Sequence, residues 1–322
     1  MDYHEILKAV AFCVIIFMFV MFFGLFTQIF SGNLEQFFIW KTVYNSQSFA
    51  GSLINSAPKN VIDFPVRDWQ VENLKIDADA SFSAQLDGRG REKILFENNG
   101  DKQLLIASLT KLMTAAVALD NHDLLEKVVV SKEDVAQGGN LRAGDSLSVK
   151  DLLYAMLIGS DNSAAYALSK IMGREKFVAL MNEKAKEFGM ENTYYTNSVG
   201  FGTKTHSTAG DLAKLTYQIL ENYPQIFAIT AMPEYDVLNF DGSLNYKAKN
   251  TNEFLNDDSL DWEKRIVGSK TGANEIAGGC FVLVLKSPDD DGYLINVILN
   301  SEDRFLEMKK IINWVNTAYK WK

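Results

Sequence analysis

The sequence predicts an α/β protein of the α+β type, in which an antiparallel sheet is flanked by N- and C-terminal helices and a mostly helical subdomain is inserted. Strand-like alternation of apolar and polar residues occurs near residue 80 and again in the last third of the chain. Helical periodicity fills the stretch between them, from about 128 to 223. Runs of strands separated by a run of helices are typical of this class.

The domain opens with a predicted β-hairpin. Residues Ala78–Leu86 alternate in strand fashion, Asp87–Gly90 form a turn, and Lys93–Phe96 form the returning strand. A helix is then expected from about Ser108 to Asp120, because its apolar side chains are spaced for one buried face.

Two helical stripes of apolar residues lie in the middle of the chain and indicate buried faces. Gly189 follows the second stripe, at the position where a glycine commonly ends a helix. Ser160–Asn162 falls between the first stripe and the next helix, so a loop is expected to present polar side chains into a cleft. The stripes comprise Leu152, Leu153, Met156 and Leu157, and then Phe177, Leu180, Met181, Ala185 and Phe188.

The last third of the chain returns to strands, predicted over Ile266–Ala273, Gly279–Lys286 and Tyr293–Leu299. Their connections are short, which favours antiparallel pairing. A final helix is expected over about Ser301–Trp321, with one apolar face turned toward the sheet.

The N-terminus predicts a membrane anchor. The run Ala9–Phe30 contains no charged side chain, and as a helix it would span about 33 Å, which is sufficient to cross a bilayer. A cleaved signal peptide is the alternative, but its apolar region is shorter and is followed by a small-x-small cleavage site, which this run lacks. We therefore expect residues 1–30 as a transmembrane anchor, 31–77 as a connector or stalk, and 78–322 as the main domain.

The net charge and the cysteine content limit the binding partners and the covalent links that are expected. The formal net charge is −9, so nucleic acid is not an expected partner, because an acidic domain gains no attraction to phosphate. Cys13 lies in the apolar run and Cys280 lies beside a predicted strand, so no disulfide within the chain is expected. Cys280 is expected to be a small buried apolar residue. No metal site and no cofactor are predicted.

Ser108 and Lys111 stand three residues apart at the expected helix start, where they share one face of the helix. The unpaired backbone N–H groups of a helix start favour a developing negative charge. Ser56 and Lys59 have the same spacing, but Pro58 disfavours a shared helical face there. Ser108 is therefore the candidate nucleophile.

A serine hydroxyl needs a base that accepts its proton, and histidine is the usual one. His4 abuts the apolar run, and neither His122 nor His206 lies in a Gly-x-Ser-x-Gly setting. Lys111 is therefore the expected base. Desolvation and a second nearby cation lower the pKa of a lysine, and Lys270 is the candidate for that cation.

Two further motifs follow Ser108 in order, namely Ser160-Asp161-Asn162 and Lys270-Thr271-Gly272. The three motifs together occur in class A β-lactamases and penicillin-binding proteins. From about Ala78 to the C-terminus the chain resembles serine-type D-alanyl-D-alanine carboxypeptidases, the low-molecular-weight penicillin-binding proteins. The segments that carry this wider resemblance are Asp151–Tyr154, Met181–Ala185, Ser207–Leu212 and Asn250–Leu255.

The resemblance implies a β-lactamase/transpeptidase-like fold with the active site between the sheet and the helical subdomain. It implies that the substrate is a peptidoglycan stem peptide ending in D-Ala-D-Ala, that β-lactams inhibit the protein, and that the catalytic domain is extracytoplasmic. Ser108 would attack the peptide carbonyl and Lys111 would take its proton. Ser160 would pass a proton to the departing D-alanine.

The resemblance also implies a set of substrate-binding residues. Asn162 would hold the substrate amide, and the oxyanion would sit between the backbone N–H groups of Ser108 and Ala273. Gly272 would let the substrate backbone lie close to the strand, as in β-strand addition. The carboxylate of the substrate would meet Lys270 and Thr271, with support from Arg304.

Three alternatives stay open. Asp161 gives Ser-Asp-Asn where these carboxypeptidases usually have Ser-Gly-Asn, so a class A-like β-lactamase is the rival enzyme. Such an enzyme needs a glutamate-activated water, but Glu234 and Asn239 have the wrong spacing and lie in a segment that predicts a strand. The bond cut could also be a cross-link, as in an endopeptidase. The non-enzyme alternative is a penicillin-sensing or wall-binding module.

Overall fold

A computed structural model of the chain describes residues 64–255 and 257–321. The predicted membrane segment Ala9–Phe30 and most of the predicted connector lie outside the described residues. In the two described ranges, no helix has both the length and the apolar character needed to cross a membrane.

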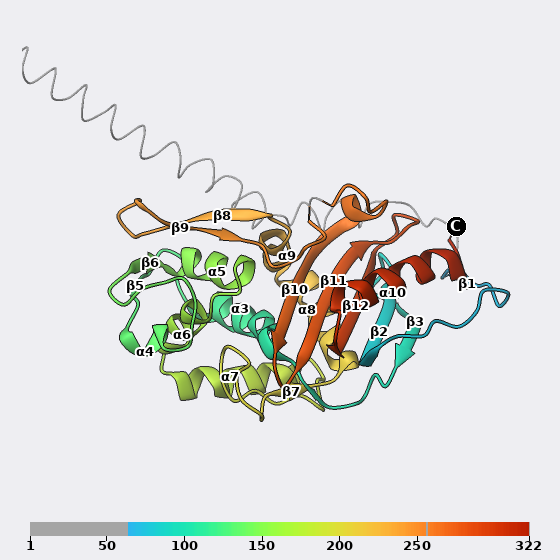
Figure 1. The fold of residues 1–322 in the computed structure, drawn as a ribbon. Coiled ribbons are helices and arrows are strands. Elements are labelled where there is room, and N and C mark those ends of the chain that lie inside the picture. Colours follow the sequence, from blue (N-terminus) through green and yellow to red (C-terminus); the bar gives the residue numbers. More distant parts are fainter. Residues whose placement is uncertain (1–63, 256, 322) are drawn as a thin grey trace, which may run out of the picture. The chain divides into compact units, whose positions relative to one another are not determined.

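The main sheet has five antiparallel strands (Figure 1). The N-terminal hairpin joins the C-terminal strands through one pairing, in which Phe82 lies opposite Val297. The strand that carries the Lys-Thr-Gly motif lies at the edge of the sheet. The strands, in spatial order, are β10 (Ile266–Asn274), β11 (Gly278–Lys286), β12 (Tyr293–Ser301), β2 (Ala78–Leu86) and β3 (Glu92–Asn98).

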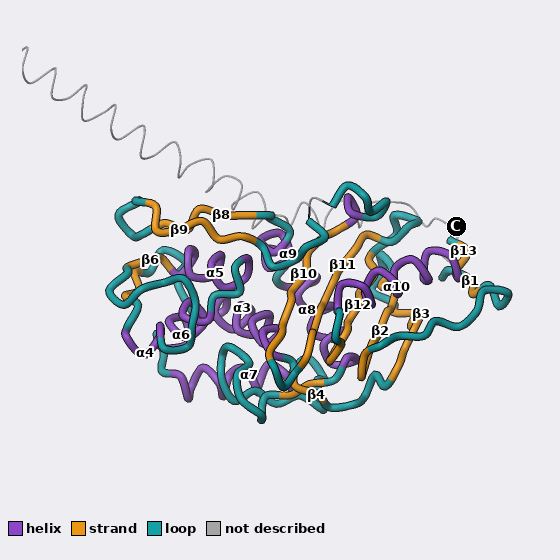
Figure 2. Tube along the Cα trace, in the orientation of Figure 1, coloured by secondary structure: helices purple, strands orange, loops and turns teal. Residues whose placement is uncertain are grey.

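Both faces of this sheet are covered by helices. Successive side chains of a strand point to opposite sides of the sheet, so each face contributes its own set of buried residues. In β11, Val282 and Val284 belong to the core on one face, whereas Phe281 and Leu283 belong to the core on the other. Helix α8 (Ala209–Asn222) packs on the first face. Helix α10 (Arg304–Ala318) packs on the second face, as its course along the strands shows (Figure 1, Figure 2).

The helical subdomain is built around α3 (Thr110–Asn121), whose residues from Thr110 to Ala118 are all buried. The helices around it are α4 (Lys132–Val135), α5 (Val149–Ile158), α6 (Asn162–Lys170), α7 (Arg174–Glu187) and α9 (Pro224–Thr230). Short strand pairs connect them: β4 (Leu104–Leu105) with β7 (His206–Ser207), β5 (Lys127–Val129) with β6 (Ser146–Ser148), and β8 (Glu234–Leu238) with β9 (Leu244–Lys249). The remaining short 3-10 helices are η1 (Ala107–Leu109) and η2 (Glu263–Arg265).

Several sequence-based expectations are confirmed. The strands β2, β10, β11 and β12 lie within two residues of their predicted bounds. Gly189 follows the end of α7 with φ of 68°, the left-handed conformation that suits a glycine after a helix. Cys280 is fully buried, and Glu234 begins a strand.

The predicted final helix is wrong at both ends. It begins after Asp303, whose carboxylate accepts hydrogen bonds from two backbone N–H groups of the first turn. It ends at Ala318, because the next residues form β13 (Tyr319–Lys320), which pairs with β1 (Val66–Arg67).

Residues 64–77, which fall in the predicted connector, pack against the C-terminal helix. The guanidinium of Arg67 lies 4.7 Å from the centre of the Trp314 ring and donates a hydrogen bond to the carbonyl of Val71 at 2.8 Å. The indole N–H of Trp314 donates to the carbonyl of Glu72 at 2.8 Å. The packed domain therefore begins before Ala78.

Candidate active site

Ser108 lies in η1, the tight turn that leads into α3. The residue before it, Ala107, has φ of 44°, a left-handed conformation that is unfavourable for alanine. Gly200 contacts this turn so closely that a Cβ there would lie 1.9 Å from the carbonyl oxygen of Ala107. The neighbouring loop therefore holds the serine turn in a conformation that it would not adopt alone.

The amine of Lys111 is fully buried one helical turn after Ser108. Its Nζ lies 2.7 Å from Ser108 Oγ and 2.7 Å from Asn162 Oδ1. Burial holds the pKa of Lys111 well below its usual value, and the charge of Lys270 lowers it further, whereas Asp161 raises it. The amine is thus placed and tuned to accept the hydroxyl proton of Ser108.

Lys270 is the second buried lysine, and it lies on β10. Burial, together with the positive charge of Arg304, lowers the pKa of Lys270 to about 7. Its Nζ donates a hydrogen bond to the carbonyl of Thr271 at 3.0 Å. An anionic ligand near this amine and Arg304 would favour the charged form, so the pair is suited to bind a carboxylate.

The edge strand β10 passes directly beside the serine turn. A Cβ on Gly272 would lie 3.0 Å from both the carbonyl oxygen of Ile106 and the backbone nitrogen of Ser108, a contact that would force the serine turn or the strand to shift by a few tenths of an ångström. Ala273, the next residue, is exposed. Among the described residues β10 has a neighbouring strand on one side only, and at its other edge the N–H of Ser269 donates to the hydroxyl of Thr230. The rest of that edge could pair with an added peptide strand.

The middle motif faces the same amine from the helical subdomain. Ser160 has φ of 57°, and Asn162 is the first residue of α6. The amide of Asn162 accepts from Lys111 and donates to the carbonyl of Gln137 at 3.0 Å. In the described part of the chain, no hydrogen bond joins the Ser160 hydroxyl to Ser108 or Lys111. The structure thus links Asn162 directly to the base and leaves Ser160 outside this network.

Arg304 and Thr271 are the other two residues that the sequence analysis assigns to binding the substrate carboxylate. Arg304 is the first residue of α10, and its buried Nε has no hydrogen-bond partner among the described residues. The Oγ1 atoms of Thr271 and Thr251 lie 2.5 Å apart. Thr251 lies in the Asn250–Leu255 segment, which resembles the family, but its side chain alone gave no signal of a role in the site.

The alternative residues make contacts of their own or lie outside the described residues. Glu234 is 51% exposed and forms an ion pair with Lys247 at 2.8 Å, and no hydrogen bond joins it to Ser108 or Lys111 among the described residues. The imidazole of His122 lies 3.1 Å from the carbonyl oxygen of Leu168. Ser56 lies outside the described residues. Within the described ranges, no group of three or more His, Cys, Asp or Glu side chains is placed to hold a metal ion.

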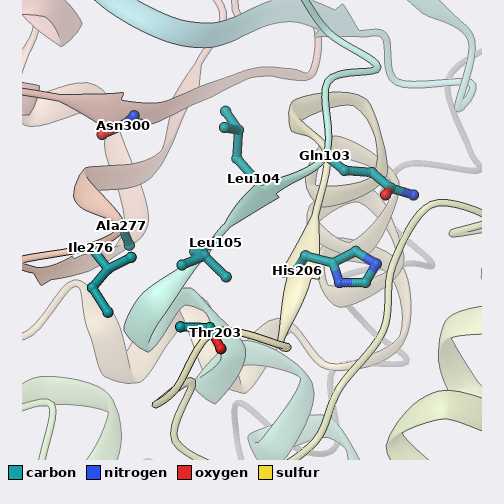
Figure 3. Close-up of a pocket in the computed structure, with 8 residues that line it drawn as sticks. All are labelled: Gln103, Leu104, Leu105, Thr203, His206, Ile276, Ala277 and Asn300. Carbon is teal, nitrogen blue, oxygen red and sulfur yellow. The ribbon is translucent and has the colours of Figure 1, made fainter.

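A separate pocket of about 340 Å³ lies around β4 and the turn between β10 and β11 (Figure 3). None of the sequence-predicted site residues lines it, and its walls carry no carboxylate, lysine or arginine. Its lining residues are Gln103, Leu104, Leu105, Thr203, His206, Ile276, Ala277 and Asn300.

The amino-acid sequence is similar to those of known proteins. The family described as D-alanyl-D-alanine carboxypeptidase matches residues 70–303. A D-alanyl-D-alanine endopeptidase of Pseudomonas aeruginosa is 31% identical over 249 residues, which are 74% of this chain and 78% of that protein. The D-alanyl-D-alanine carboxypeptidase DacC of Escherichia coli is 32% identical over 69% of this chain and 58% of its own length.

Solved structures give the same picture. A Streptomyces DD-transpeptidase superposes with a TM-score of 0.67 at 27% identity and covers 77% of this chain and 100% of that one. A D-alanyl-D-alanine carboxypeptidase of Mycobacterium tuberculosis superposes with a TM-score of 0.68 at 25% identity and covers 78% and 95%. The predicted transpeptidase-like α+β fold is therefore confirmed.

The buried amine makes a prediction about stability. We expect Lys111→Met to raise the free energy of unfolding at pH 7 by about 0.5–2 kcal/mol, because it removes a group whose charged form is disfavoured by burial. The folded-state pKa lies below the unfolded value of about 10.4, so between the two the unfolded chain binds more protons and wild-type stability rises with pH. The advantage of the variant should therefore shrink toward pH 10.

Denaturant unfolding at pH 7 and pH 9.5 measures this difference. Lys176→Met, at an exposed position of α7, is the control and should show no pH-dependent gain. A Lys111→Met protein that is no more stable than wild type at pH 7 would contradict the prediction.

Proposed function

The chain belongs to the D-alanyl-D-alanine carboxypeptidase family, and we propose that it is a serine-type DD-peptidase that removes the terminal D-alanine from peptidoglycan stem peptides. The observation that carries the proposal is the buried Lys111 amine, 2.7 Å from the hydroxyl of Ser108. A lysine whose pKa burial holds well below its usual value can do the work that histidine does in other serine hydrolases.

Acylation follows from this pair. Ser108 Oγ attacks the carbonyl carbon between the two D-alanines while its proton moves to Lys111 Nζ. The carbonyl oxygen becomes an oxyanion, which the backbone N–H groups of Ser108 and Ala273 stabilise, each by about 3 kcal/mol. The C–N bond then breaks, and the proton on Lys111 passes through Ser160 to the nitrogen of the leaving D-alanine. An ester on Ser108 remains.

Deacylation uses the same groups in reverse. Lys111 is neutral again once the D-alanine has taken its proton, so it can accept a proton from an attacking water. The water oxygen bonds to the ester carbon, the bond to Ser108 Oγ breaks, and the serine recovers its proton. Departure of D-alanine leaves the space that this water needs.

The remaining site residues are proposed to bind the substrate. The C-terminal carboxylate of the stem peptide lies near Lys270, Thr271 and Arg304, where the unpaired Nε of Arg304 gains a partner. The peptide adds to the open edge of β10 beside Gly272, and the amide of Asn162 contacts it from the opposite wall. The packing of β10 against the serine turn and the link between Asn162 and Lys111 support this arrangement.

Ser108→Ala tests the proposal. We expect wild type to release D-alanine from a pentapeptide and to form one covalent adduct with penicillin, because the same hydroxyl attacks both carbonyls. The variant should lose both. Intact-protein mass spectrometry and a D-alanine assay are the measurements. An adduct without any D-alanine release would favour a penicillin-sensing module instead, and an adduct that survives in Ser108→Ala, for example on Ser56, would refute the assignment.

The rate of β-lactam hydrolysis distinguishes this enzyme from a β-lactamase. An opened β-lactam stays tethered and blocks the path of water, so we expect fast acylation and slow deacylation, with turnover lower by about 10²- to 10⁴-fold for lack of a dedicated base. Nitrocefin turnover beside D-alanine release measures this. Glu234→Gln should change neither rate, since Glu234 is paired on the surface. Rapid nitrocefin turnover that this substitution abolishes would establish the β-lactamase.

An endopeptidase is the second candidate, because the similar Pseudomonas aeruginosa protein carries that name. It would use the same chemistry on a cross-linked D-alanine, with a second stem peptide as the leaving group. Incubation with a pentapeptide and with a cross-linked muropeptide separates the two. Release of free D-alanine supports the carboxypeptidase, whereas conversion of the cross-linked dimer to monomers alone supports the endopeptidase.

We also propose that residues 1–30 stay attached and anchor the domain at the outer face of the membrane, with the following segment as its connector. The charge-free run Ala9–Phe30 supports this proposal. N-terminal sequencing of the protein extracted from membranes should find these residues. A mature chain that begins beyond residue 30 would show that the segment is a cleaved signal.

A further inference from the structure

The carboxylate of Asp161, in the middle motif, is buried and accepts three hydrogen bonds. Its Oδ1 accepts from the backbone N–H of Ala164 at 3.0 Å, and its Oδ2 accepts from the backbone N–H of Asn140 at 2.6 Å. The hydroxyl of Tyr246 donates to Oδ2 at 3.2 Å. Three separate segments, namely α6, the loop after α4 and strand β9, therefore meet at one side chain that is only 2% exposed.

The loop after α4, residues 137–140, is fitted to this carboxylate. A Cβ on Gly139 would lie 2.2 Å from Asp161 Oδ1, and Gly139 has φ of 141°, so glycine is required on both counts. The carbonyl of Gln137 accepts from the amide of Asn162, and the carbonyl of Gly138 accepts from Ser163. The loop therefore fixes the amide of Asn162 with its oxygen turned toward Lys111.

Strand β9 contacts the chain around Ser160 and Asp161 as well. A Cβ on Gly159 would lie 3.5 Å from the Ala248 Cβ, so the residue before Ser160 contacts this strand. Burial and the nearby Asp161 carboxylate raise the pKa of Tyr246, which keeps its hydroxyl protonated as a donor. Ser160, which has φ of 57°, lies between Gly159 and Asp161, the two residues that make these contacts.

We propose that Asp161 is a positioning residue for the peptidase reaction: by binding Asn140, Ala164 and Tyr246 at once, it holds Ser160 and Asn162 at their places in the cleft. This inference rests on the proposed function. A glycine at this position would leave all three donors without this acceptor. An asparagine would present an N–H₂ group to at least one of them, where two donors would then face each other.

The negative charge of Asp161 also affects the pKa of Lys111, and this effect can be measured separately. The charge of Lys270 on β10 lowers the pKa of Lys111 and that of Asp161 raises it, while the charge of Arg304 lowers the pKa of Lys270. Tyr246 faces Asp161 and is neutral. Since Asp161 favours the charged form of Lys111, its neutralisation should lower the pKa of that amine. Lys111 must be neutral to accept a proton, so the acid limb of acylation should move to lower pH.

Asp161→Asn and Tyr246→Phe test the inference. The measurements are kcat and KM for D-alanine release, and the pH profile of penicillin acylation of Ser108. Asp161→Asn should lower kcat by about 10- to 100-fold, because misplacement by about 1 Å has that effect, and should move the acid limb to lower pH. Tyr246→Phe removes one hydrogen bond but leaves the charge, so kcat should fall several-fold with the acid limb unmoved.

The outcomes separate the hypotheses. A folded Asp161→Asn protein with wild-type kcat and an unmoved acid limb would overturn the inference. If that variant does not fold, Tyr246→Phe decides, and an unchanged kcat there also overturns it. If wild type neither releases D-alanine nor reacts with penicillin, the proposed function fails instead, whatever the variants do.

Discussion

The burial of the Lys111 amine is the constraint on which the cleft depends. An ammonium group without water is unfavourable unless a carboxylate contacts it, and among the described residues the hydrogen-bond partners of the amine are a hydroxyl and an amide oxygen. The site is therefore built for the neutral amine. The carboxylate that raises the pKa of Lys111, that of Asp161, is engaged by three other donors and acts on Lys111 only through its field. A contacting carboxylate would instead have stabilised the charged and inactive form.

The elements that the sequence predicts well are those with a strong local pattern. The strands of the sheet alternate or run apolar between clear turns, and Gly189 marks the end of α7. The Ser-x-x-Lys spacing lies within one helical turn, so the proximity of Ser108 and Lys111 follows from helix geometry alone. These features need no knowledge of which elements meet in space.

Features that depend on distant contacts could not be predicted in this way. The left-handed turn at Ala107 packs closely against Gly200, and Gly272 packs closely against the serine turn. The end of α10 is set by the pairing of β13 with a strand that precedes the sheet. The same holds for Asp161, two of whose three donors, the backbone N–H of Asn140 and the hydroxyl of Tyr246, come from other segments of the chain.

The order of strands in the main sheet also governs when the active centre can form. Strand β2 pairs with β3, which follows it directly, and with β12, which is made near the end of the chain. The serine turn likewise completes its packing only when β10 has formed beside it. Pairings between distant segments form slowly, because a long loop must close before they stabilise anything. A chain that lacks β10 and β12 therefore has Ser108 without the strand that packs beside it, and one edge of β2 is left open for pairing with another strand.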